Sequence, residues 1–598
     1  MTFTPPPAFT TRPTLTGTFG MTASTHWLAT ASAQAVLERG GNAFDAVVAG
    51  GFVLHVVEPH LNGPGGDLVG IFATAADPAA PVVLMGQGPA PAGASIEHYR
   101  EQGLDLVPGA GGLAAAVPAA VDAWLTLLRD HGTCELGDVL SAAIGYARDG
   151  HPLLAQASAT IGRVAPLFRE HWPSSAALWL PEGRVPPAGT MVRNPAYADV
   201  LESLVAAGRG IRDEGPVGRA ARIDAARGEW KSGRVAQAAS AFLAVPHRHS
   251  DGRDHRGVIT ASDFARFDAG YEAPVSIPFR GHTIAKAGAW TQGPALLQTL
   301  RILEGHAEAD PSTEAGAHAV LEALKLALAD RDAYYGDGDV PLDVLLSEEY
   351  ASVRRAQIGQ SASHEWRPGR IPGREPFRPP LRTAAAEGAS GGGEPTIDRS
   401  GQTRGDTCHI DVVDRWGNMI AVTPSGGWLQ SSPTIPELGF CLGTRLQMTW
   451  LDESSPAALR PGARPRTTLT PTLVLRAGQP IMALGTPGGD QQEQWQVPVL
   501  LRMLAGGYSA QEAIDAPSLH TTALVDSFWP RGWDPAGAVV EDRIGEPVIA
   551  GLERRGHTVT RAGDWSLGRV SAVGRDAATG VVWAAANPRG MQGYAAGR

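Results

Sequence analysis

The feature that most constrains this chain is a threonine that opens a strand-like run directly after a segment with little to bury. Residues 383–406 are rich in glycine, alanine and serine. Thr407 then begins a run with apolar and β-branched residues that ends at Asp414, and a second such run ends at Thr423. This order predicts a flexible leader that stops at a core strand. If the bond between Asp406 and Thr407 is cut, Thr407 gains a free amine that can activate its hydroxyl as a nucleophile.

The length of 598 residues permits two or more average domains, or one large core with elaborations. Hydrophobic residues make up 43%, as in soluble globular proteins, and no apolar run approaches the length of a membrane span. Residues 1–20 have neither a basic start nor an apolar stretch, so they do not read as a signal peptide. The sequence therefore predicts a cytoplasmic location.

Charge and cysteine usage exclude several kinds of partner and site. The formal net charge is −11 and no basic stripe is present, which argues against nucleic acid as a partner. The three cysteines are scattered, as expected neither for a disulfide framework nor for a zinc cluster. Three histidines fall within residues 247–256, but that stretch reads as an exposed, solvated loop. The sequence therefore predicts no metal and no cofactor.

Hydrophobic periodicity predicts helices and strands that alternate along the chain. A nearly all-apolar helix is expected after Asn42 as its N-cap, and this helix should lie between layers. Central strands with helices outside indicate a layered α/β fold whose core includes both halves of the chain. Helices are expected at 27–39, 43–57, 117–129, 135–149, 293–303, 315–335, 495–505 and 510–516, and strands at 68–73, 81–86, 409–414, 418–424, 472–476, 480–484, 569–574 and 581–586. Residues 355–406 read as a linker.

Short motifs are spread over nearly the whole chain in one order: 20–24 (GMTAS), 40–46 (GGNAFDA), 57–60 (VEPH), 63–67 (GPGGD), 292–293 (QG), 407–409 (TCH), 464–472 (RPRTTLTPT), 485–490 (GTPGGD) and 587–589 (NPR). Each is weak alone. Together they make the chain resemble the gamma-glutamyltransferase family of N-terminal-nucleophile hydrolases.

The resemblance implies a fold of class α/β (α+β), namely a four-layer αββα sandwich. It also implies one precursor that cleaves itself between Asp406 and Thr407. Residues 1–406 would form the large-subunit portion, with residues 383–406 as the leader, and residues 407–598 would form the small-subunit portion. The two fragments would stay associated in one core, and the sequence does not specify whether they form a further oligomer.

By the same resemblance, Thr407 is the nucleophile and its new α-amine is the base. An α-amine has a pKa of roughly 7.7–8.0, so it is partly neutral at physiological pH. Ser425 stands where the family has a second threonine that hydrogen-bonds the nucleophile. Gly488 and Gly489 match the glycine pair whose N–H groups form an oxyanion hole. Without the resemblance, a strand threonine before a hairpin would be the ordinary reading of Thr407.

The predicted substrate-binding residues are Arg445, Thr467, Thr468 and Gln87. Thr467 and Thr468 take the positions of a substrate-binding serine pair, although a plain strand entrance is the alternative. Residues 85–91 contain no arginine where the family holds the γ-glutamyl group, and Gln87 is the polar residue there. Arg445 could pair with a substrate carboxylate in bidentate fashion.

Other positions depart from the transferase pattern. Gly427 replaces an asparagine, and Met448 replaces an acidic residue that would hold an ammonium group. The segment 452–465 is shorter than the family's lid loop, which favours water as the acceptor. The glycine-rich stretch 63–66 lacks the Lys-Ser/Thr of a phosphate loop and is predicted to be a structural turn.

The sequence therefore predicts a self-processing amide hydrolase that acts on a small carboxylate-bearing amide or a γ-glutamyl compound. Candidates range from glutathione-like compounds to oxamate. Two alternatives stay open: a true γ-glutamyl transferase with an acceptor peptide, and an unprocessed, inactive binding protein with the same fold.

Overall fold

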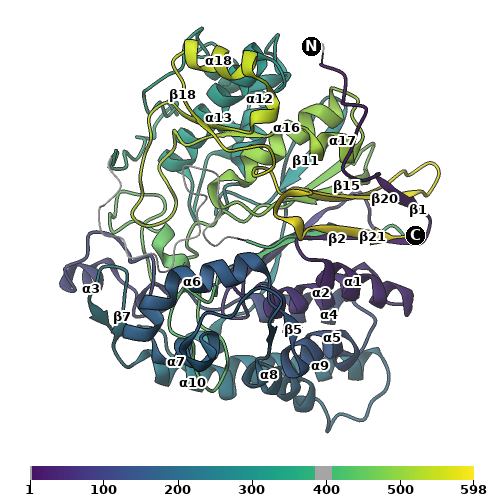
Figure 1. The fold of residues 1–598 in the computed structure, drawn as a ribbon, viewed down its shortest axis with the longest axis vertical. Coiled ribbons are helices and arrows are strands. Elements are labelled where there is room, and N and C mark those ends of the chain that lie inside the picture. The colour runs from purple at the N-terminus through teal and green to yellow at the C-terminus, as the bar shows by residue number, and fades with distance from the viewer. Residues whose placement is uncertain (1–2, 384–406) are drawn as a thin grey trace.

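Two seven-stranded antiparallel sheets form the centre of the molecule (Figure 1). The computed structural model describes residues 3–383 and 407–598. The first sheet contains β2 (Gly20–Ser24), β3 (Asp67–Ala73), β4 (Val82–Gly86), β9 (Gly270–Glu272), β12 (Ile410–Asp414), β13 (Met419–Ser425) and β21 (Tyr594–Gly597), in the spatial order β21-β2-β12-β13-β3-β4-β9. The second contains β1 (Leu15–Gly17), β10 (Val275–Phe279), β11 (His282–Lys286), β14 (Thr472–Arg476), β15 (Gln479–Gly485), β19 (Ser571–Arg575) and β20 (Val582–Ala586), in the order β1-β20-β19-β15-β14-β11-β10.

Helices cover the outer face of each sheet, as Figure 1 shows. The first sheet is covered by α1 (Trp27–Glu38), α2 (Ala43–Val57) and α4 (Ala120–His131), with α5 (Leu136–Asp149), α8 (Pro195–Ala207), α9 (Pro216–Ser232) and α10 (Arg234–Leu243) packed behind them. The second lies against α12 (Gly293–Glu304), α13 (Glu314–Tyr334), α16 (Gln492–Leu504) and α17 (Ala510–Asp515).

Smaller elements surround these layers. The remaining helices are α3 (Ile96–Glu101), α6 (Ala155–Glu170), α7 (Pro173–Trp179), α11 (Ala261–Arg266), α14 (Leu342–Leu345), α15 (Glu348–Arg355) and α18 (Glu546–Arg554). A three-stranded sheet combines β16 (Leu519–Thr521), β17 (Gly537–Val540) and β18 (Thr558–Arg561). Two two-stranded sheets pair β5 (His151–Pro152) with β6 (Met191–Val192) and β7 (His247–Arg248) with β8 (Asp254–His255).

Strand β13 shows how the sequence builds the layers. Its side chains alternate: Ile420 and Val422 join the core shared with the helices, whereas Met419 and Ala421 join the core between the two sheets. Both faces of the strand are buried, so its sequence is a nearly continuous apolar run. Helix, sheet, sheet and helix thus form the predicted four-layer αββα sandwich.

Helix α2 confirms the prediction of a buried helix capped by Asn42. The Asn42 side chain accepts from the backbone of Asp45, and the Asp45 side chain accepts from Asn42 N, which makes a capping box. All residues of the helix are buried. Gly50 permits close packing on the first sheet, because a Cβ there would lie 2.3 Å from Ile410 Cδ1. The middle of the helix therefore packs closely on β12.

Strands from both portions of the chain share each sheet. In the first sheet, β12 and β13 lie between β2 and β3. In the second, β14 pairs with β11 from the earlier portion. Within the described residues, no helix combines the length and the apolar character that crossing a membrane requires.

The prediction of an exposed loop at residues 247–256 is wrong. This stretch forms the β7–β8 hairpin, and His249 and His255 are buried in it. The two ring nitrogens of His249 already have partners, since Nε2 accepts from Leu113 N at 2.9 Å and Nδ1 lies 2.7 Å from the His247 carbonyl. A period-2 pattern of so few residues is too short to reveal a hairpin from sequence.

Candidate active site

Thr407 lies at the entrance of β12 and is only 2% exposed. Its hydroxyl donates to the Ser425 hydroxyl at 3.1 Å, across the end of the β12–β13 pair. Cys408 N continues this pairing by donating to Pro424 O at 3.0 Å. The structure therefore brings together the predicted nucleophile and its predicted hydroxyl partner. Asp406, the other side of the predicted cleavage site, lies outside the described residues.

Glu58, at the end of α2, fixes the chain immediately after Thr407. Its Oε2 accepts from Cys408 Sγ at 3.0 Å and from Thr25 Oγ1 at 2.6 Å, while Gln592 donates to Oε1. Burial raises the pKa of Glu58. The sequence showed Glu58 only as part of a short motif, and the contact with Cys408 could not be read from it.

The glycine-rich turn at 63–66 is structural, as the sequence predicted. It packs backbone to backbone on the loop after Ser425: a Cβ on Gly66 would lie 2.1 Å from Ser425 O, and one on Gly63 would lie 2.4 Å from Gly427 O. Gly427 itself has a φ of +63°, which favours glycine. The turn thus sets the backbone beside Ser425.

Arg445 is paired with Asp67, which lies opposite Ser425 in the β3–β13 register. Its Nε and Nη2 contact the two carboxylate oxygens of Asp67 at 2.6 and 2.7 Å, and both side chains are buried. Asp67 therefore occupies the two guanidinium nitrogens that a bidentate contact with a substrate carboxylate would use. Asp67 was missed because it was taken as the last residue of a turn motif.

An apolar wall follows Arg445. Met448, Trp428 and Phe528 form a buried cluster, and Arg445 Nη1 lies 3.5 Å from Met448 Sδ. A thioether and two aromatic rings cannot hold an ammonium group by ion pairing. This wall agrees with the prediction that Met448 has lost the ammonium-binding role.

The loop after β15 carries the predicted oxyanion-hole glycines. Gly488 has a φ of +135° and Gly489 a φ of +52°. Among the described residues, none accepts a hydrogen bond from either N–H group. His409 packs against Gly485 at the start of this loop, since a Cβ on Gly485 would lie 2.2 Å from His409 Cε1. The loop therefore begins beside the segment that Thr407 opens.

Polar side chains at the start of α12 and on α13 hold the loop after β15. Gln292 donates to Gly489 O at 2.9 Å and accepts from Arg331 Nη1 at 2.7 Å. Arg331 also forms a buried ion pair with Asp490. Asp490 in turn accepts from Ser527 N at 2.8 Å and from the Ser527 hydroxyl at 2.6 Å. These contacts fix the backbone that carries Gly488 and Gly489.

The two hydroxyls of the predicted threonine pair differ in their hydrogen bonding. The Thr467 hydroxyl accepts from Leu469 N at 3.3 Å, which is a local backbone contact. The Thr468 hydroxyl is buried and has no hydrogen-bond partner among the described residues. Of the pair, Thr468 is the one with an unused hydroxyl.

Arg466 is a candidate that sequence reasoning passed over, although it lies inside the 464–472 motif. It is 4% exposed, and its Nη2 donates to the Ser527 hydroxyl at 2.7 Å. Its Nη1 is buried without a partner in the described part of the chain. Burial, and then the charge of Arg331, lower the pKa of Arg466 to about 10. It is still a cation at neutral pH and has one donor group unused.

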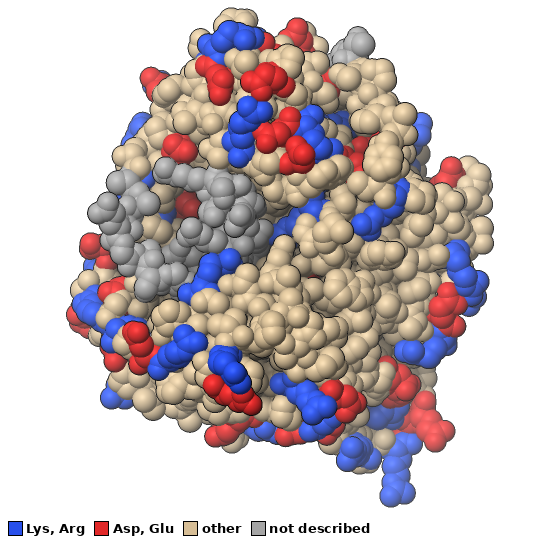
Figure 2. Space-filling view, in the orientation of Figure 1, with Lys and Arg blue, Asp and Glu red and all other residues tan. Residues whose placement is uncertain are grey.

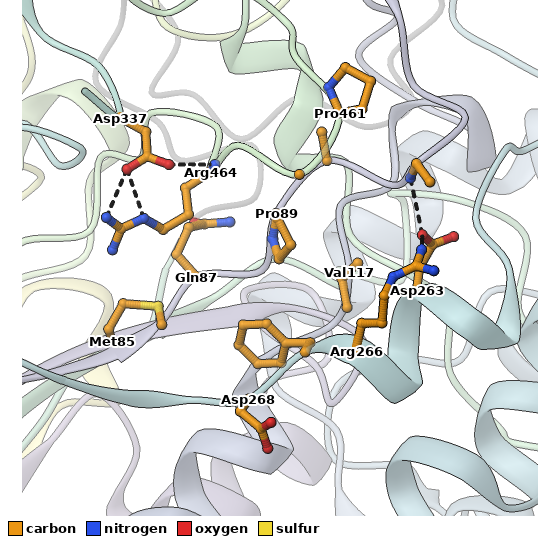
Figure 3. Close-up of a pocket in the computed structure, with 14 residues that line it drawn as sticks. Met85, Gln87, Pro89, Val117, Asp263, Arg266, Asp268, Asp337, Pro461 and Arg464 are labelled. Carbon is orange, nitrogen blue, oxygen red and sulfur yellow. Dashed lines mark hydrogen bonds and ion pairs between the residues drawn. The ribbon is translucent and has the colours of Figure 1, made fainter.

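Gln87 lines a cavity of about 600 Å³ beyond β4 (Figure 3). Figure 3 shows Gln87 and the Asp337–Arg464 pair on one side of the cavity and Asp263 with Arg266 on the other. The Gln87 side chain is buried and its Oε1 has no partner among the described residues. Thr407 does not line this cavity.

Sheet register relates this cavity to Ser425. Ser425 pairs with Asp67, and the next residue of β3, Leu68, pairs with Gly86 of β4. Gln87 follows Gly86 and thus lies two strands from Ser425, which corresponds to about 10 Å across the sheet.

On the face drawn in Figure 2, charged residues of both signs are interspersed around a broad uncharged area.

Comparison with known proteins shows the family of this chain. The family model of gamma-glutamyltranspeptidase matches residues 29–597. The glutathione hydrolase-like YwrD proenzyme of Bacillus subtilis (strain 168) is 30% identical over 96% of this chain and 98% of its own length. The oxamate amidohydrolase proenzyme of Klebsiella pneumoniae is 29% identical, over 97% and 98% respectively.

A solved structure, that of LmbA2991T421A, is also similar. It is 52% identical with a TM-score of 0.92, and the match covers 99% of this chain and 100% of that one. The chain therefore belongs to the gamma-glutamyltranspeptidase family of enzymes.

Proposed function

We propose that this chain is a self-processing amide hydrolase with Thr407 as its nucleophile. The observation that carries the proposal is the buried hydrogen bond between the Thr407 and Ser425 hydroxyls, just before β12 begins. The names of the two relatives, both proenzymes, support a precursor that must be cut. Cleavage before Thr407 would give this residue both a free α-amine and a hydroxyl, so that the amine can activate the hydroxyl.

Processing would use the same hydroxyl as turnover. Thr407 Oγ1 attacks the Asp406 carbonyl carbon, the C–N bond to Thr407 breaks, and the Thr407 nitrogen takes the proton. Water then hydrolyses the resulting ester, which restores the hydroxyl and leaves a carboxylate on Asp406. The two fragments would remain together because each contributes strands to both sheets.

In turnover, the Thr407 amine would take the hydroxyl proton as Oγ1 attacks the substrate amide. The Gly488 and Gly489 N–H groups would stabilise the tetrahedral oxyanion, where one donor is worth a few kcal/mol. The protonated amine then gives its proton to the leaving amine. Water hydrolyses the acyl-enzyme by the same path in reverse.

For the substrate, we propose a small amide whose acyl group carries a carboxylate and needs no ammonium group. The unused Nη1 of Arg466 and the Thr468 hydroxyl would bind the carboxylate. The wall of Trp428, Met448 and Phe528 offers no carboxylate to pair with an α-ammonium group. The name of the relative that acts on oxamate fits this chemistry. Gln87 would contact the distal part of a longer substrate.

A γ-glutamyl transferase is the second candidate, supported by the family model. The discriminating experiment measures release of amine from oxamate and from a γ-glutamyl amide, with and without an acceptor dipeptide. Hydrolysis of oxamate with no acceptor stimulation is the expected result. Strong acceptor stimulation with a γ-glutamyl donor favours the transferase, and a chain that stays whole and inactive favours the binding protein. The cytoplasmic location stays a prediction.

A further inference from the structure

Three buried side chains of types that bind metals lie close together: His318, Glu322 and His557. His318 and Glu322 lie four residues apart on α13 and therefore share one helix face. His557 comes from the turn between α18 and β18. One ligand atom from each of the three lies within 4.8 Å of the other two. Figure 1 shows α13 and α18 near each other at the edge of the molecule that the second helix layer forms.

The two imidazoles face each other through their nitrogens. His318 Nδ1 lies 2.9 Å from His557 Nε2, and His318 Nε2 lies 2.9 Å from the Gly359 carbonyl. The carbonyl requires a proton on His318 Nε2, so His318 Nδ1 presents a lone pair to His557. A backbone carbonyl on the second nitrogen is the usual support of a metal-binding histidine.

The spacing suits a transition metal after a small adjustment. Two nitrogens bound to one tetrahedral zinc ion at roughly 2.0–2.1 Å lie about 3.3 Å apart. The two nitrogens therefore need to separate by a few tenths of an ångström, and the proton that His557 Nε2 donates to His318 Nδ1 must move to His557 Nδ1, so that both lone pairs can reach the metal. The opposite nitrogen of His557, Nδ1, is buried and has no hydrogen-bond partner among the described residues.

The third ligand determines which metal is expected. The Glu322 carboxylate accepts from Lys325 Nζ at 2.8 Å, from Ser363 N at 3.2 Å and from Arg367 Nη2 at 2.7 Å. Two cations compensate its charge, so it contributes less to the affinity than the imidazoles do. Magnesium and calcium prefer several anionic or carbonyl oxygens, whereas zinc and its neighbours accept imidazole.

We propose that His318, His557 and Glu322 form a binding site for a divalent transition metal of the zinc type. The metal would join α13 to the α18–β18 turn, and water would complete its coordination. The site is separate from the machinery around Thr407, so its occupancy does not depend on the proposed reaction.

The test uses the full-length chain, freed of metal with a chelator and titrated with zinc chloride alone in a calorimeter. One equivalent should bind, and His557→Gln and His318→Gln should each weaken binding at least tenfold. His306→Gln, a change at a half-buried histidine outside the cluster, should bind like the unchanged chain. No binding near one equivalent, or full binding by His557→Gln, would overturn the site.

A second measurement needs no variant. X-ray absorption fine structure of the zinc-loaded, unchanged chain should show two imidazole nitrogens around the metal. A shell made of oxygens alone, or a single imidazole, contradicts the proposal even if His557→Gln fails to fold.

Discussion

Asp67 holds the guanidinium group of Arg445 through two buried contacts of 2.6 and 2.7 Å, one strand away from Ser425. The sequence predicted that Arg445 binds a substrate carboxylate, but in the structure its charge is compensated by Asp67. The ion pair borders the apolar cluster of Met448, Trp428 and Phe528. The Asp67–Arg445 pair should therefore contribute to the free energy of unfolding.

Removing the carboxylate should leave an uncompensated buried charge. Asp67→Asn should lower the free energy of unfolding by about 3–5 kcal/mol, the usual effect of breaking a buried pair. The double variant Asp67→Asn/Arg445→Met should lose less than the sum of the single variants. Urea unfolding of the four proteins measures this. Strict additivity would show that the two side chains do not stabilise each other.

The Ser425 hydroxyl should matter for rate and little for substrate affinity. Ser425→Ala removes the group that accepts from Thr407 Oγ1, so kcat should fall by about 10- to 100-fold through misplacement of the nucleophile. Ser425→Thr keeps the hydroxyl and serves as the matched control. Steady-state kinetics on a chain already cut at Thr407 separates this effect from processing. An unchanged kcat in Ser425→Ala would be inconsistent with the proposed contact.

Arg466 should recognise a substrate carboxylate. A hydrogen bond to a charged group contributes about 1.5–3 kcal/mol, so Arg466→Gln should raise KM for oxamate by about 10- to 100-fold. The same change should leave KM for a neutral amide nearly unaltered. Arg460→Gln, at an exposed arginine, is the control. Equal effects of Arg466→Gln on charged and neutral amides would point to a structural role.

Histidine burial predicts a loss of stability in acid. Burial lowers the pKa of His55 to about 3, whereas an unfolded histidine has a pKa of about 6.5. Between these values the unfolded chain binds more protons, so this stability is complete above pH 6.5 and is lost as the pH falls toward 3.

His55→Gln should remove that dependence. The difference in unfolding free energy between the variant and the unchanged chain should shift by about 1.4 kcal/mol per pH unit within this window. Urea unfolding at three pH values from 4.5 to 7.5 measures the shift. A constant difference across the series would mean that His55 keeps an ordinary pKa in the folded chain.

Most of the layered fold could be predicted because its elements carry strong local signals. Strand β13 is a nearly continuous apolar run, and Asn42 is a recognisable N-cap before α2. Short elements such as β2 and the β7–β8 hairpin were not predicted as strands, since a few residues carry no reliable period. Helix α9 carries only a weak helical pattern, because its residues are largely polar.

The site was predictable where a motif contains the functional residue. Thr407 and Ser425 were named from sequence and lie within hydrogen-bond distance. The partner of Arg445 was not predictable, because Asp67 is 378 residues away in the chain. The free nitrogen of Arg466 depends on what surrounds it in space, and no sequence pattern reports that.

The central claim is that Thr407 becomes an N-terminus by the action of its own hydroxyl. The most direct measurement is the intact mass of the purified chain together with N-terminal sequencing. Two fragments are expected, residues 1–406 and a second one beginning at Thr407, whereas Thr407→Ala should remain one chain of 62.5 kDa. A native chain that stays whole after long incubation, or a Thr407→Ala chain cut at the same bond, would contradict the account.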